Sequence, residues 1–121
     1  MNLSEKDKQI AEHIMRYCEE VKMALSTFGA NNTIFMQNPV FRNACSMPIL
    51  QIGELAKRLS EEFQLVSSDI PWRQIKNMRN LFAHDYRSMD DEIIWQTITK
   101  SVPALHERLA EILEETISSS P

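Results

Sequence analysis

The chain has 121 residues, of which 43% are hydrophobic and 25% charged, a composition typical of a globular protein, and we expect one domain over residues 1–121. Its net charge of −4 argues against a protein whose main task is to hold nucleic acid through the phosphates. Gly29 and Gly53 are its two glycines, which leaves little material for phosphate-binding loops or tight hairpins and favours an all-α fold.

Cysteine usage and the apolar runs predict the compartment. Cys18 and Cys45 stand alone, without a C-x-x-C pair or a histidine at ligand spacing, which argues against a disulfide framework and a structural zinc site. The first residues lack the apolar core of a secretion signal, and no apolar run approaches the roughly 18 residues that span a membrane. We therefore expect a cytoplasmic protein that uses no metal and no cofactor.

The first predicted helix starts after Ser4, a favoured capping residue that acidic residues follow in the first turn. Apolar residues then recur every three or four positions from Ile10 to Phe28, and Gly29 marks the helix end. Residues 33–37 are predicted to form a short helical turn.

Asn38 and Pro39 predict the start of the next helix, with asparagine as the cap and proline at the first helical position. The apolar pattern then runs to Phe63, but Pro48 interrupts it, so this segment is either one kinked helix or two abutting helices. Residues 65–70 are predicted to form a loop.

Pro71 opens a further amphipathic helix, and residues 88–92 predict the capped start of the last one, whose apolar pattern runs to Leu113. Pro103 lies inside that last pattern and predicts a kink. Long helices joined by short loops predict an up-and-down bundle of four or five helices.

Residues 78–86 read Met-Arg-Asn-Leu-Phe-Ala-His-Asp-Tyr and carry the groups that phosphodiester chemistry needs. Arg79 is permanently charged and offers a fork of donors that matches a phosphate. His84 can exchange a proton near neutral pH. Asn80 can orient a neighbour or the scissile group, and Tyr86 carries a phenol beyond the histidine. The ordinary alternatives are a surface ion pair, a helix-end histidine, a solvated amide and a packing tyrosine.

The spacing of Arg79 and His84 has a geometric consequence. Five residues of α-helix separate two positions by roughly 7.5 Å along the axis and by roughly 140° around it, so a straight helix does not converge them. Three alternatives remain: the helix loosens near His84, the long Arg79 swings across, or a second chain completes the site. Metal-free RNA cleavage needs a base, an acid and positive charge on the phosphorane, and one histidine supplies one proton transfer at a time. An isologous homodimer would bring two copies of each group together.

The motif resembles the signature of the HEPN superfamily, and specifically the R-x4-H-x-Y motif of its HepT-like branch. Arg79, Asn80, His84 and Tyr86 fill the four positions. The context is also similar, with Ile-Gly-Glu-Leu-Ala at residues 52–56 and Ile-Pro-Trp-Arg-Gln-Ile at residues 70–75. The likeness is clearest from about Ile49 to Tyr86.

This resemblance implies a homodimeric, helical, metal-independent endoribonuclease that acts as a toxin beside a minimal nucleotidyltransferase antitoxin. Arg79, His84 and Asn80 would be catalytic, and RNA rather than DNA would be the substrate. The partner of such toxins is thought to transfer AMP onto the motif tyrosine, here Tyr86. Bulky negative charge two residues from His84 would obstruct the entry of RNA.

Basic residues concentrate around the motif, where residues 71–87 hold four basic side chains and one acidic one, a net charge of +3. Arg73, Lys76 and Arg87 could therefore steer RNA, or could be ordinary solvated charges. Glu54 could point into the cleft or form an ordinary ion pair, and Gly53 is expected to permit close helix packing. The rival function is a non-catalytic helical dimer that binds a nucleotidyltransferase partner or a nucleotide.

Overall fold

A computed structural model describes residues 3–84 and 91–118 of the chain, with side chains over residues 3–80 and 92–115. All regular structure in these residues is helical. It forms six segments, in chain order α1 (Glu5–Phe28), α2 (Asn32–Gln37), α3 (Pro39–Ala56), α4 (Glu61–Val66), α5 (Trp72–His84), and a last segment that comprises α6 (Asp91–Gln96), the π-helix η2 (Thr97–Ser101) and α7 (Val102–Ser118).

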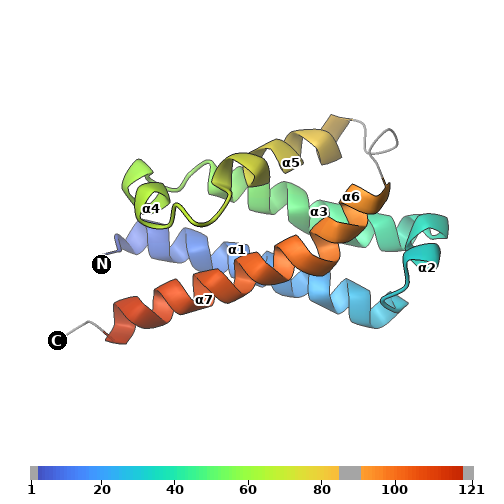
Figure 1. Cartoon of the computed structure of the whole chain (residues 1–121), viewed down its shortest axis with the longest axis horizontal. Coiled ribbons are helices and arrows are strands. Elements are labelled where there is room, and N and C mark those ends of the chain that lie inside the picture. The colour runs from blue at the N-terminus through green and yellow to red at the C-terminus, as the bar shows by residue number, and fades with distance from the viewer. Residues whose placement is uncertain (1–2, 85–90, 119–121) are drawn as a thin grey trace.

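The four long segments alternate in direction, so that α1, α3, α5 and the α6–α7 segment run up and down beside one another (Figure 1). Helix α1 packs against α3 and α7, and α3 also packs against α5. The short helices α2 and α4 lie at opposite ends of the bundle (Figure 1). The predicted all-α, up-and-down architecture is therefore confirmed.

Capping residues begin and end these helices where the sequence predicts it. The Ser4 side chain accepts a hydrogen bond from the Asp7 N–H at 3.0 Å, and Gly29 ends α1 with a positive φ of 89°. Asn38 Oδ1 accepts from the N–H groups of Val40 and Phe41, with Pro39 as the first helical residue. The predicted short helical turn is α2, which Asn31 caps.

Two predicted boundaries next to α4 are wrong. The apolar pattern predicts that the third helix reaches Phe63, but α3 ends at Ala56 and a separate helix, α4, follows it. Ser60 starts α4, because its hydroxyl accepts from the Phe63 N–H at 3.1 Å while its own N–H and O–H donate to the buried carboxylate of Asp7. Helix α4 also continues to Val66, inside the segment predicted as a loop.

The two interior prolines have different outcomes. Pro48 is buried inside α3, which is one helix rather than two. Pro103 instead follows the π-helical stretch Thr97–Ser101, where the Val102 N–H donates to the Thr97 carbonyl five residues back. Because proline has no N–H and its ring collides with the carbonyl four residues before it, the wider π-helical turn accommodates it. The sequence predicts a kink at Pro103, and the structure has a π-helical turn just before it.

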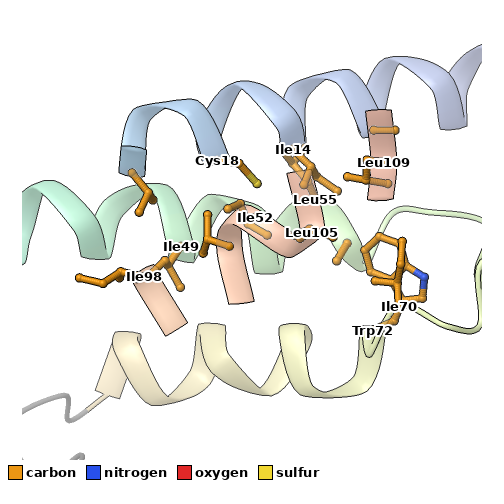
Figure 2. Packing of buried hydrophobic residues seen from close by; sticks show 14 of the residues in the cluster. Ile14, Cys18, Ile49, Ile52, Leu55, Ile70, Trp72, Ile98, Leu105 and Leu109 are labelled. Atoms are coloured by element: carbon orange, nitrogen blue, oxygen red, sulfur yellow. The ribbon is translucent and has the colours of Figure 1, made fainter. Parts of the chain in front are cut away.

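The core lies between α1, α3 and α7, where aliphatic side chains such as Ile14, Ile52 and Leu109 interleave (Figure 2). Both cysteines are free and buried in this core. Burial raises the pKa of each thiol to about 12, so both are protonated and unreactive at neutral pH. None of the described helices combines the length and the apolar character needed to cross a membrane.

Candidate active site

Helix α5 carries the predicted motif and is anchored at its first turn. Trp72 is 5% exposed, and its Nε1–H donates to Ser67 Oγ at 3.0 Å. The Ser67 hydroxyl in turn donates to the Phe63 carbonyl at 2.5 Å. Figure 2 shows the Trp72 ring beside Ile70 at the edge of the core. Trp72 is therefore a core anchor that holds the start of α5.

Arg79 lies against α3 and is held at two points. Its Nε forms an ion pair with Glu54 Oε1 at 2.5 Å, and its Nη1–H donates to Asn80 Oδ1 at 3.1 Å. The side chains of Arg79 and Glu54 are 32% and 39% exposed. The structure thus brings together Arg79 and Asn80, and leaves part of the Arg79 side chain open to solvent.

Gly53 explains how Arg79 comes so close to α3. A Cβ atom placed on Gly53 would lie 2.3 Å from Arg79 Cβ and 3.3 Å from Arg79 Cα, distances at which the two helices could not keep this separation. The expectation that Gly53 permits close helix packing is confirmed. The sequence left open whether Glu54 points into the cleft or forms an ordinary ion pair, and the structure pairs it with Arg79. Its position directly after Gly53, a glycine inside a helix, was the one signal in the sequence that Glu54 lies at a close helix contact.

The helix remains regular through the histidine of the motif. Helix α5 is α-helical from Trp72 to His84, so the alternative in which it loosens near His84 is wrong. On such a helix the positions of Arg79 and His84 diverge by roughly 140° around the axis. The side chain of His84, and Tyr86 and Arg87 entirely, lie outside the described residues.

The predicted RNA-steering residues occupy separate surroundings. Arg73 is exposed in the first turn of α5. Lys76 is half-buried, and its Nζ donates to Gln64 Oε1 of α4 at 2.8 Å. Lys76 is therefore held toward α4 while Arg79 is held toward α3.

An apolar cavity of about 100 Å³ lies between α3, α5 and the α6–α7 segment, lined by side chains such as Ile52, Met78 and Leu105. None of the described side chains that line it is ionisable, so these offer no group for acid–base chemistry. Among the described residues, no three His, Cys, Asp or Glu side chains gather as they would around a metal ion.

Comparison of the sequence with known proteins assigns the chain to a family. The family described as Ribonuclease HepT-like matches residues 8–112. A protein of Caldanaerobacter subterraneus subsp. tengcongensis named "Putative RNase TTE0752" is 35% identical over 104 residues, which cover 86% of this chain and 91% of that protein. A protein of Thermococcus cleftensis named "Probable ribonuclease HepT" is 33% identical over 54 residues, which cover 45% of this chain and 49% of that protein. No solved structure matches the chain significantly. The chain therefore belongs to the HepT-like ribonuclease family.

Proposed function

We propose that this protein is a metal-independent endoribonuclease whose active site contains Arg79, Asn80 and His84. The observation that carries the proposal is that Glu54 and Asn80 hold the guanidinium of Arg79, whose side chain is partly exposed on the helix that also carries His84. Membership of the HepT-like ribonuclease family supports the same activity. The local excess of basic residues around the motif supports an anionic substrate in a chain whose net charge is −4.

The reaction uses the 2′-hydroxyl of the RNA as its own nucleophile. A base removes the 2′-OH proton, the O2′–P bond forms, and the P–O5′ bond breaks as an acid protonates the leaving 5′-oxygen. His84 serves in one of these two roles. The N–H groups of Arg79 that face solvent bind the phosphorane oxygens, on which negative charge accumulates in the transition state. Asn80 holds the guanidinium at Nη1.

The second proton transfer falls to a second copy of the chain, and we propose that the protein works as an isologous homodimer. Because positions 40, 47 and 54 are seven residues apart, Val40, Met47 and Glu54 share one face of α3. Val40 is 61% exposed and Met47 is 58% exposed, while Glu54 contacts Arg79. A second copy that covers this apolar stripe would lie beside the site and contribute its own His84.

We further propose that the protein is the toxin of a toxin–antitoxin module with a minimal nucleotidyltransferase. The partner would transfer AMP from ATP to the hydroxyl of Tyr86 and release pyrophosphate. The added negative charge and bulk two residues from His84 would repel RNA and obstruct its entry. This part of the proposal rests on the R-x4-H-x-Y motif at residues 79–86.

The decisive experiment measures cleavage of a defined RNA by the purified protein and by two variants. We expect His84→Ala to lower kcat by about a hundredfold or more, since a general acid or base contributes about 10²–10⁴. Arg79→Lys should also cut slowly, because a lysine cannot reproduce the planar fork of donors. EDTA should leave the parent rate unchanged.

The matched controls are His13→Ala and Arg16→Ala, which remove the same side-chain types from the exposed face of α1. Both should cut RNA like the parent. A His84→Ala variant that cuts as fast as the parent would refute the catalytic role. A parent that cuts no RNA but forms a stable complex with a nucleotidyltransferase or a nucleotide would favour the non-catalytic rival.

A further inference from the structure

The α3 side of the site consists of two adjacent residues, Gly53 and Glu54, which both act on Arg79. Gly53 lets the backbone of α5 approach, because a Cβ atom at this position would lie only 2.3 Å from Arg79 Cβ. Glu54 then meets the Arg79 Nε at 2.5 Å. A contact at this point would be out of reach if α5 lay farther from α3. The two residues therefore work together.

The contacts that hold Arg79 determine which of its N–H groups remain available to an anion. A guanidinium has five N–H groups in a rigid plane. Glu54 forms an ion pair with Nε, and Asn80 accepts one N–H of Nη1, so the guanidinium is held at two points. Among the described residues, no side chain other than Glu54 and Asn80 holds the guanidinium, so the remaining N–H groups of the two Nη atoms can bind an anion. An arginine without these partners would lose side-chain rotamer entropy on adopting one such orientation.

We propose that Glu54 is a positioning residue that orients the guanidinium of Arg79 for the phosphorane without touching RNA. This inference rests on the proposed ribonuclease function. It has a distinctive kinetic consequence, because a carboxylate beside the site also repels the phosphates of the substrate. Removing Glu54 should therefore slow the chemical step and leave RNA binding as tight as before or tighter.

The test compares Glu54→Ala and Glu54→Gln with the parent protein in single-turnover and steady-state cleavage of a defined RNA. We expect Glu54→Ala to lower kcat by about tenfold to a hundredfold, the range expected when a catalytic group loses its alignment, with no rise in KM. Glu54→Gln removes the charge but keeps an oxygen atom that can contact the Arg79 Nε. This variant should retain kcat within about threefold of the parent. Glu20→Ala, an equal change of charge on the exposed face of α1, should leave kcat and KM unchanged.

A second readout is independent of cleavage. In nitrogen-15 spectra the Arg79 Nε–H should exchange slowly with water in the parent and in Glu54→Gln, and rapidly in Glu54→Ala. A parent that cuts no RNA removes the proposed function, and this exchange measurement then decides whether Glu54 orients Arg79. Equal exchange in the parent and Glu54→Ala, an unchanged kcat in Glu54→Ala, or a rise in KM alone would each overturn the inference.

Discussion

Replacing Gly53 by alanine tests how closely α5 must approach α3. The added Cβ would lie 2.3 Å from Arg79 Cβ, whereas ordinary contact begins at 3.4 Å, a shortfall of 1.1 Å. The colliding atom is the Cβ of Arg79, and the Arg79 Cγ and Cα lie at 3.0 Å and 3.3 Å. The Cβ and Cα atoms cannot move by rotation of the side chain. The backbone of α5 must therefore shift away from α3.

Two effects of opposite sign set the magnitude. Alanine in place of glycine inside a helix stabilises it by about 1 kcal/mol. Overpacking a well-packed contact costs about 1–3 kcal/mol, and a rigid helix shift belongs at the upper end of that range. We therefore expect Gly53→Ala to lower the free energy of unfolding by about 1–2 kcal/mol and Tm by about 3–8 °C. The shift also withdraws Arg79 from Glu54, so RNA cleavage should fall as well.

Thermal and urea unfolding followed by circular dichroism measure the stability change, and cleavage of a defined RNA measures the activity. Asn77→Ala is the control, because Asn77 is exposed on α5 and its replacement improves helix propensity without adding a contact. This control should be as stable as the parent or more stable. The reasoning fails if Gly53→Ala shows the same gain in Tm and cleaves RNA at the parent rate.

Two further predictions concern stability. Burial raises the pKa of Asp7, but hydrogen bonds from Ser60 and Ser4 outweigh it and lower this pKa below its ordinary 3.8. The carboxylate therefore stabilises the fold above pH 3.8, and this contribution is lost as the pH falls through the lowered pKa. Asp7→Asn should cost about 1–3 kcal/mol at pH 7, and urea unfolding should find a smaller difference at pH 3; an equal difference at both pH values would contradict the linkage. Ser67→Ala should cost about 1–3 kcal/mol, because the buried Trp72 Nε1–H loses its acceptor, whereas a Tm equal to that of the parent would show that another acceptor replaces it.

Local features of the sequence are sufficient for most helix boundaries. Ser4 and Asn38 cap helices through hydrogen bonds to residues two or three positions away. Both partners of each bond therefore lie within the short sequence pattern from which the cap is predicted. The start of α4 at Ser60 has a local cap of the same kind, because the Ser60 hydroxyl accepts from the Phe63 N–H, but the continuous apolar pattern concealed it. The contact of Ser60 with Asp7, which is 53 residues distant, is one that no local pattern indicates.

The prolines show the same limit. Pro48 and Pro103 are equally visible in the sequence, yet one lies inside a single α-helix and the other follows a π-helical turn. In each helix the backbone must accommodate a proline, which has no N–H to donate to the carbonyl four residues before it. The sequence does not indicate which accommodation occurs, because that depends on what packs around the helix.

For the candidate site, the sequence by itself determined the all-helical architecture, the family likeness and the motif of Arg79, Asn80 and His84 on one helix. It did not determine which residue of α3 meets Arg79. That contact depends on the separation and register of α3 and α5, which are decided where Gly53 allows the backbone of α5 to approach. The Glu54–Arg79 ion pair therefore exists only in the tertiary structure, because residues far apart in the chain become neighbours only when the two helices pack.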